Sequence, residues 1–149
     1  MGDFLETSYD KFIFKVKTGY LYSRDDFWAS VEGNIAVIGV SDFLQKTRGD
    51  VAFLEAVDTG TEVKQDQEIG VIETIKATFG IMAPVSGKII EVNPELEANP
   101  YLINQDPYGA GWIYRIELTD FESDKRNLLQ DESYMKLMEE KIAVEVQKK

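Results

Sequence analysis

The middle of the chain holds a run of apolar and β-branched residues that one lysine interrupts. Residues 71–75 precede the interruption, and residues 81–85 follow it and lead into a turn over residues 84–87. Two short β-rich runs around a brief break are typical of strand, tight turn and strand, which places Lys76 at the tip. We expect the whole stem of this lysine to lie in water, where it stabilises the fold poorly but is well placed to carry an attached group.

Turn and cap residues divide the chain before this run into further elements. Residues 33–34 are Gly-Asn, which supplies the positive φ angles of a tight hairpin turn within residues 27–38. Ser41 is a suitable N-cap for a short helix that runs to about Lys46 and ends before Gly49. A strand over residues 50–57 follows, and its alternation predicts that one face holds Val51, Phe53 and Glu55.

The second half of the chain changes from strands to helices. Further strands are predicted at residues 62–64, 68–73, 80–83, 88–92 and 112–118. Between the last two, we expect a short helix over residues 95–98 and a turn-rich loop over residues 99–111. Residues 120–129 contain a short helix, and Asp131 or Ser133 caps a longer one. Its apolar residues recur at helical spacing and are expected to pack on the core: Tyr134, Leu137, Met138 and Ile142.

The chain shows no linker, so we expect one folded body with additions at both ends. Residues 1–26 form an N-terminal extension, in which residues 12–17 alternate as a short, edge-lying strand. Residues 27–119 form the main domain. Residues 120–149 form C-terminal helices that pack on the same domain.

Composition excludes several classes of function. The formal net charge of −11 disfavours nucleic acid and anionic membrane surfaces as partners, because the summed field repels phosphates. With no cysteine and no histidine, the chain has no thiol nucleophile, no imidazole acid or base and none of the usual zinc ligand sets, so we expect no metal site and no catalytic residue. Paired carboxylates alone are compatible with an enzyme. The chain has no signal-peptide pattern and no membrane-spanning apolar run, and a cytoplasmic location is expected.

Lys76 and Glu73 are the candidate site residues. A lone lysine in a turn is usually a solvated surface charge, and the pattern E-x-x-K-A is weak evidence by itself. A residue that several enzymes must reach is best held on rigid backbone, however, and a strand–turn–strand tip meets that requirement. Glu73 either orients the lysine or is recognised by the enzyme that modifies it; it is equally compatible with a plain surface charge.

Two long motifs around Lys76 are specific enough to compare with a known family. Residues 69–93 read I-G-V-I-E-T-I-K-A-T-F-G-I-M-A-P-V-S-G-K-I-I-E-V-N, and residues 93–112 read N-P-E-L-E-A-N-P-Y-L-I-N-Q-D-P-Y-G-A-G-W. The first resembles the lipoyl-attachment hairpin of the glycine cleavage system H-protein family. The second resembles the segment that follows that hairpin and sets H proteins apart from other lipoyl domains. The similarity covers roughly residues 27–142.

This resemblance implies a carrier of lipoic acid, attached covalently to Lys76 by a lipoate ligase or lipoyl transferase. It implies a mainly β fold with terminal helices, the flattened β-barrel or hybrid barrel-sandwich of lipoyl and biotinyl carriers. The protein would be no enzyme itself. Its lipoyl-lysine would act as a swinging arm that carries a bound intermediate and reducing equivalents between partner enzymes, and the loaded arm would be sheltered against the protein. The implied partners are glycine decarboxylase, aminomethyltransferase and dihydrolipoyl dehydrogenase.

The sequence departs from the family beside this site. Residues 26–28 are Asp-Phe-Trp where H proteins have His-Glu-Trp, and residues 78–80 are Thr-Phe-Gly where the family has a small residue and a serine–aspartate pair. The N-terminal leader is also longer than usual. Such differences are typical of an H-like lipoate-binding paralogue, whose arm carries sulfur intermediates for a heterodisulfide-reductase-like sulfur-oxidising complex. Both cargoes use the same arm, so the sequence leaves both open.

Two other hypotheses belong to different classes. A biotinyl carrier has methionine on both sides of the modified lysine, whereas Ile75 and Ala77 flank Lys76 here. An unmodified H-like domain could act as a scaffold or regulatory binder. The mass of the protein from its native cell separates these hypotheses from the lipoyl carrier.

Overall fold

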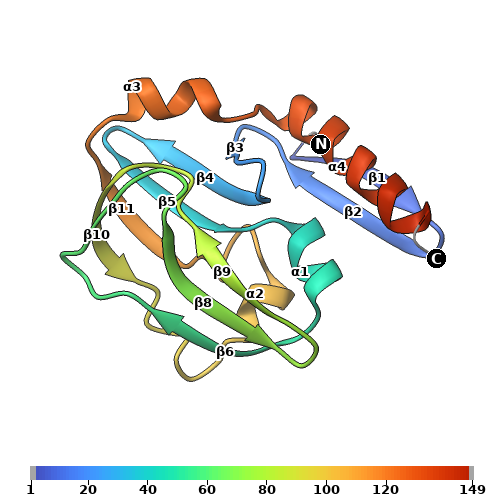
Figure 1. The fold of residues 1–149 in the computed structure, drawn as a ribbon, viewed down its shortest axis with the longest axis horizontal. Coiled ribbons are helices and arrows are strands. Elements are labelled where there is room, and N and C mark those ends of the chain that lie inside the picture. The colour runs from blue at the N-terminus through green and yellow to red at the C-terminus, as the bar shows by residue number, and fades with distance from the viewer. Residues whose placement is uncertain (1–2, 148–149) are drawn as a thin grey trace.

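The computed structural model describes residues 3–147 and contains antiparallel sheets with helices packed around them (Figure 1). One sheet has six strands in the order β3-β4-β5-β11-β10-β7, a second has three in the order β6-β8-β9, and β1 and β2 pair with each other. The strands are β1 Phe4–Tyr9, β2 Phe12–Lys17, β3 Leu21–Tyr22, β4 Phe27–Glu32, β5 Ile35–Val40, β6 Val51–Ala56, β7 Glu62–Val63, β8 Glu68–Thr74, β9 Thr78–Met82, β10 Gly87–Val92 and β11 Tyr114–Leu118. The helices are α1 Asp42–Arg48, α2 Leu102–Gln105, α3 Phe121–Asp124, the 3₁₀ turn η1 Lys125–Asn127 and α4 Asp131–Gln147. The predicted mainly β fold with terminal helices is confirmed.

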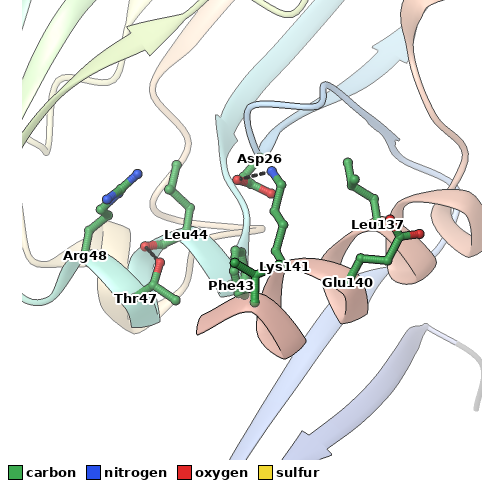
Figure 2. Close-up of a pocket in the computed structure, with 9 residues that line it drawn as sticks. Asp26, Phe43, Leu44, Thr47, Arg48, Leu137, Glu140 and Lys141 are labelled. Atoms are coloured by element: carbon green, nitrogen blue, oxygen red, sulfur yellow. Dashed lines mark hydrogen bonds and ion pairs between the residues drawn. The ribbon is translucent and has the colours of Figure 1, made fainter. Parts of the chain in front are cut away.

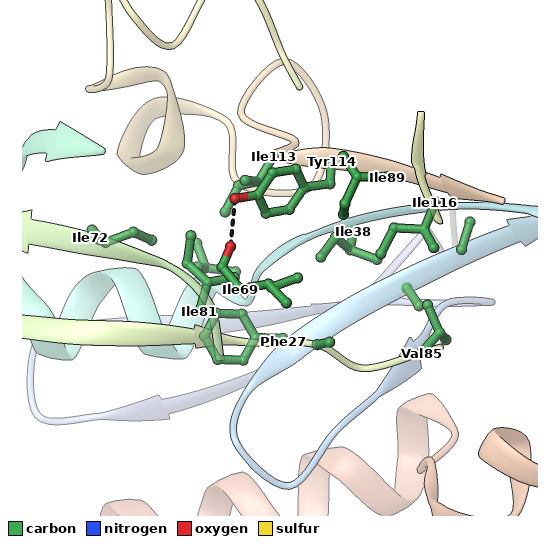
Figure 3. Close-up of a cluster of buried hydrophobic side chains, with 14 of the residues drawn as sticks. Phe27, Ile38, Ile69, Ile72, Ile81, Val85, Ile89, Ile113, Tyr114 and Ile116 are labelled. Atoms are coloured by element: carbon green, nitrogen blue, oxygen red, sulfur yellow. Dashed lines mark hydrogen bonds between the residues drawn. The ribbon is translucent and has the colours of Figure 1, made fainter. Parts of the chain in front are cut away.

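The main core lies between the six-stranded and the three-stranded sheet (Figure 3). Ile38 and Ile116 of the larger sheet and Ile72 of the smaller one are fully buried in it. The Tyr114 hydroxyl donates to the carbonyl of Ile69 (2.5 Å) and so links the two sheets. Two sheets closed around one core form the flattened barrel-sandwich that the sequence led us to expect.

A second, aromatic core joins both ends of the chain to the main body. Trp28 is almost fully buried, and its indole N–H donates to the carbonyl of Pro107 (2.9 Å). Tyr22 and Tyr134 stack with ring centroids 4.4 Å apart, which brings α4 against the larger sheet. The hairpin β1–β2 and α4 lie together on this side of the molecule (Figure 1). The N-terminal and C-terminal segments are therefore held by packing.

The predicted turn at Gly33 and the predicted caps of α1 are found in the structure. Gly33 has φ 63° in the two-residue turn between β4 and β5, whereas Asn34 does not have the positive φ that was also expected of it. The Ser41 hydroxyl caps α1 by accepting the N–H of Leu44 (3.2 Å). Gly49 ends that helix with φ 95° and ψ −171°, a conformation that glycine adopts without steric cost. The helix runs to Arg48, two residues beyond the expected end.

The predicted face of β6 is wrong. Val51 is buried as expected, but Phe53 is 52% exposed. The pairing of β6 with β8 shifts between Val51 and Phe53, which marks a β-bulge. A bulge inserts one extra residue into the alternation, so every side chain after it changes face. Leu54 takes the inward position and packs against the main core.

The predicted helix over residues 95–98 is also wrong. These residues form turns, and α2 lies inside the segment predicted as loop. The Asn93 side chain accepts the N–H of Glu95 (3.1 Å), as a helix N-cap would, but the turns that follow do not continue into a helix. Ile103 of α2 is almost fully buried, so packing on the core stabilises the later position.

The N-terminal extension contains more structure than the sequence indicated. The strand expected near residues 12–17 is confirmed as β2, whereas its partner β1 and the short β3 were not predicted. The division into residues 1–26, 27–119 and 120–149 stays a prediction, and its outermost residues, 1–2 and 148–149, lie outside the described residues. Among residues 3–147, no helix is long and apolar enough to cross a membrane.

Candidate functional site

Lys76 lies at the exposed turn between β8 and β9, as predicted. Hydrogen bonds of Thr74 hold this turn: its hydroxyl donates to the carbonyl of Arg48 (2.7 Å) and accepts the N–H of Ala77 (3.0 Å). The N–H of Ile75 donates to the carbonyl of Asp50 (3.1 Å). The turn is therefore both accessible and fixed to the end of α1, which suits a residue that must be presented to other enzymes.

The stem of Lys76 runs close to Gly49 at the C-terminal end of α1, while the residue as a whole is exposed, as expected. An ideal β-carbon built on Gly49 would lie 3.2 Å from Cε and 3.4 Å from Cγ of Lys76. Any side chain at position 49 would therefore press on the lysine stem. Glycine at this position leaves room for the stem and gives it a backbone surface to lie on.

Asn104, in the segment after β10, holds this end of α1 by hydrogen bonds. Asn104 donates from Nδ2 to the carbonyl of Gly49 (3.0 Å) and accepts the N–H of Val51 at Oδ1 (2.8 Å). Its amide also donates to the Gln45 side chain (3.0 Å). One asparagine of the second sequence motif thus connects α2, α1 and the start of β6 beneath Lys76.

Glu73 is exposed on the outward face of the three-stranded sheet. It lies opposite Phe53 on β6 and Thr78 on β9. The ion pairs of the described residues join Lys46 to Asp42, Arg115 to Glu91 and Lys141 to Asp26, so none joins Glu73 to Lys76. The structure places Glu73 near the lysine without a direct contact, and its role stays a prediction.

A groove of about 490 Å³ lies between α1 and α4 (Figure 2). Asp26 and Lys141 pair at its centre (2.8 Å), while Arg48 lies at one end and Leu137 and Glu140 at the other. Its apolar walls come from both helices and include Phe43, Leu44 and Val144. A long apolar chain with a polar end fits such a surface.

Asp26 is held in place by a buried hydrogen-bond network. Tyr134 donates from its hydroxyl to Oδ1 of Asp26 (2.7 Å) and lies 2.9 Å from Oγ of Ser41. Burial, followed by the nearby charge of Asp26, raises the pKa of Tyr134 well above its usual value. The tyrosine therefore stays a proton donor to this carboxylate.

The groove and Lys76 meet at the C-terminal end of α1. Arg48 lines the groove, and the lysine stem passes so close to the adjacent Gly49 that a β-carbon there would lie 3.2 Å from Cε. The Arg48 guanidinium also lies over the ring of Phe79 (5.5 Å), three residues after the lysine. A group attached to Lys76 thus begins beside the groove's Arg48 end.

The sequence indicated only part of this site. It singled out Lys76, Glu73 and the unusual residues 26–28 and 78–80. Of these, Asp26 lines the groove and Phe79 lies against Arg48, which also lines it. The sequence did not single out Lys141 and Arg48, because only the folded chain brings α4 and α1 to the two sides of one groove. Gly49 was recognised as a helix end but not as the support of the lysine. The described residues hold no group of three or more carboxylates arranged to bind a metal.

Comparison with known proteins places this geometry in a family. The family profile described as glycine cleavage H-protein matches residues 20–141. A glycine cleavage system H protein of Carboxydothermus hydrogenoformans is 45% identical over 119 residues, which are 80% of this chain and 91% of that protein. A probable glycine cleavage system H protein of Pyrococcus abyssi is 40% identical over 126 residues, 84% of this chain and 93% of that protein. The crystal structure of a Mycobacterium marinum H protein covers 75% of this chain and 98% of its own, with TM-score 0.65 and 27% identity.

Proposed function

The chain belongs to the glycine cleavage H-protein family, and on this premise we propose that it is a lipoyl carrier with lipoic acid bound as an amide to Nζ of Lys76. The observation that carries the proposal is the exposed lysine on an ordered turn, with its stem supported by Gly49. The carrier is a component of a multienzyme system and catalyses no reaction itself. A cytoplasmic location belongs to the same proposal.

The residues around Lys76 fit this attachment. The lysine Nζ is exposed to a lipoate ligase or lipoyl transferase, and Glu73 offers that enzyme a fixed charge three residues away. When attached, the lipoyl group supplies disulfide chemistry that a chain without cysteine lacks. The chain's own residues hold the lysine stem, present it to successive enzymes and offer a groove beside it.

We propose that the groove between α1 and α4 is the resting place of the arm. It begins at Arg48, next to Gly49, and the apolar part of its wall is made of Phe43, Leu44, Leu137 and Val144. Apolar walls bury a hydrocarbon chain favourably, because they remove its surface from water. The arm would thus be shielded between visits to partner enzymes.

Glycine cleavage is the cargo chemistry that the relatives favour. In that role the partners are glycine decarboxylase, aminomethyltransferase and dihydrolipoyl dehydrogenase, and the arm carries an aminomethyl group and reducing equivalents. The exposed turn that holds Lys76 allows all three enzymes to reach it in turn. This is the first candidate for the cargo.

A sulfur intermediate is the second candidate, and Arg48 favours it. The guanidinium of Arg48 belongs to none of the three ion pairs of the described residues, although it lines the groove beside the arm. An unpaired cation attracts an anionic sulfur group and repels a protonated amine. Arg48, which lies over the Phe79 ring, therefore favours the hypothesis that the arm delivers sulfur intermediates to a heterodisulfide-reductase-like sulfur-oxidising complex.

Two measurements test these proposals separately. Lys76→Arg keeps the charge but cannot be lipoylated, so we expect a folded protein that a lipoate ligase leaves unmodified. Labelling of Lys76→Arg at another lysine would contradict the assigned site. For the cargo, lipoylated protein is combined with glycine decarboxylase and aminomethyltransferase; turnover of glycine supports the first candidate, and no turnover supports the sulfur candidate.

A further inference from the structure

The hairpin β1–β2 presents exposed apolar side chains that the proposed carrier function does not use. Tyr9, Phe12 and Ile13 surround its turn and are 44%, 52% and 50% exposed, and Phe4 at its other end is 40% exposed. The hairpin precedes residues 20–141, which match the family profile. It is thus an addition to the carrier module with an apolar end.

The packing of the fold does not explain these exposed residues. On the inner face, Phe14 and Val16 are buried in the aromatic core, and Thr7 donates to Glu139 of α4 (3.0 Å). Phe12 and Ile13 lie beyond this covered part, at the turn. The inner face therefore stabilises the fold, whereas the turn leaves apolar area free, which is typical of an interaction site.

The outer face of the hairpin has a small net positive charge on a strongly acidic protein, because Lys15 and Lys17 lie there with one acid, Glu6, opposite Lys15. Residues 4–17 carry three lysines against two acids, a formal charge of +1, while the whole chain carries −11. Lys15 and Lys17 lie over the Phe4 ring with Nζ 5.5 and 4.8 Å from its centre. The ion pairs of residues 3–147 are made elsewhere. This face is thus complementary to a surface that bears carboxylates.

The hairpin is fixed to the same helix as Lys76. On α1, Asp42 accepts the N–H of Lys15 (2.9 Å), and Lys46 donates to the carbonyl of Ile13. Gly49, which the Lys76 stem passes closely, lies three residues after Lys46, about 4.5 Å further along the helix axis. Figure 1 shows the β1–β2 turn and the β8–β9 turn on the side of the molecule where α1 lies. An enzyme that receives the arm therefore meets the hairpin as well.

We infer that the β1–β2 hairpin docks an enzyme that acts on the arm, and that this enzyme offers an apolar depression edged by carboxylates. The inference rests on the proposed function. Phe12 and Ile13 enter the depression, while Lys15 and Lys17 face the carboxylates. The hairpin thereby selects the partner, and Lys76 delivers the cargo.

The test measures KM and kcat with lipoylated protein as the substrate. The enzymes are purified from the native cell: glycine decarboxylase, aminomethyltransferase, dihydrolipoyl dehydrogenase and the heterodisulfide-reductase-like complex. For at least one of them, the double variant Phe12→Ser/Ile13→Ser should raise KM about tenfold and leave kcat unchanged, as expected when buried apolar anchors are lost. Ile90→Ser, at a residue 40% exposed on β10, is the matched control and should leave KM unchanged.

The charge component has its own variant. Lys15→Glu/Lys17→Glu should raise KM and remove most of its dependence on salt, whereas Lys64→Glu, at an exposed site outside the hairpin, should do neither. Circular dichroism and the melting temperature establish that each variant is folded.

The outcomes separate this inference from the function on which it rests. If no enzyme turns over the lipoylated wild type, the proposed function fails, and the docking assignment fails with it. If the wild type is turned over and Phe12→Ser/Ile13→Ser has an unchanged KM with every enzyme, only the docking assignment is overturned. Dimerisation of the wild type in sedimentation that Phe12→Ser/Ile13→Ser abolishes would also overturn it, because the occupant would be a second copy.

Discussion

Gly49→Ala should disturb the fold and the proposed modification site together. Gly49 has φ 95° and ψ −171°, a region that residues with a β-carbon enter at a cost of about 1–3 kcal/mol. The added carbon would also lie 3.2 Å from Cε of Lys76, so the stem must move. We expect a loss of about 2 kcal/mol in the free energy of unfolding. For a chain of this length, that corresponds to a fall of roughly 4–8 °C in melting temperature.

Gly60→Ala is the matched control for this prediction. Gly60 has φ 90°, but a β-carbon there would meet nothing within 4 Å. Both variants should lose stability in urea unfolding, whereas only Gly49→Ala should be lipoylated more slowly, by up to about tenfold, because only it displaces the lysine. Equal lipoylation rates for the two variants would refute the idea that Gly49 positions Lys76. A loss below about 0.5 kcal/mol for Gly49→Ala would refute the backbone argument.

Substitutions of Glu73, Lys141 and Tyr22 test the charge beside the lysine, the groove's ion pair and the aromatic core. Glu73→Gln should slow modification by the lipoate ligase without changing the urea midpoint. The control Glu55→Gln, on the neighbouring strand, should change neither the rate nor the midpoint. Equal lipoylation rates for the two variants would leave Glu73 as a plain surface charge. Lys141→Met leaves the buried Asp26 carboxylate without its cation and should lower the free energy of unfolding in urea by about 1–3 kcal/mol, less than for a fully buried pair because Lys141 is partly exposed. Adding Asp26→Asn to this variant should restore part of the lost stability. Unchanged stability of Lys141→Met would contradict the pairing. Burial raises the pKa of tyrosines such as Tyr22. Above about pH 10, the unfolded chain therefore loses protons that the folded chain keeps. The free energy of unfolding should then fall by about 1.4 kcal/mol per pH unit for each buried tyrosine. Tyr22→Phe should reduce that slope, and a flat profile between pH 9 and 11 would contradict the burial.

Features that depend on local chemistry could be predicted from the sequence. The turn at Lys76, the hairpin at Gly33 and the cap at Ser41 each follow from a few neighbouring residues, and the structure confirms them. The resemblance to the H-protein family is confirmed as well, because it rests on two long motifs around the lysine. The local signals and the two motifs both indicated a hairpin with Lys76 at its tip, so the two kinds of evidence supported the same prediction.

Features that depend on contacts between distant segments could not be predicted. The bulge that exposes Phe53 is visible only in the pairing of β6 with β8, and α2 is stabilised by the burial of Ile103 in the core. The groove exists because α4 packs beside α1, which brings Lys141 to Asp26 across 115 positions of sequence. The periodicity of each segment was visible, but its neighbours in space were not.

The attachment of lipoic acid to Lys76 is tested by the mass of the intact protein purified from its native cell, with peptide mapping of Lys76. We predict one lipoyl group, located on Lys76 and absent from the Lys76→Arg variant. An unmodified Lys76 in a cell with available lipoate and an active ligase would show that the protein is not a lipoyl carrier, as would biotin on that residue.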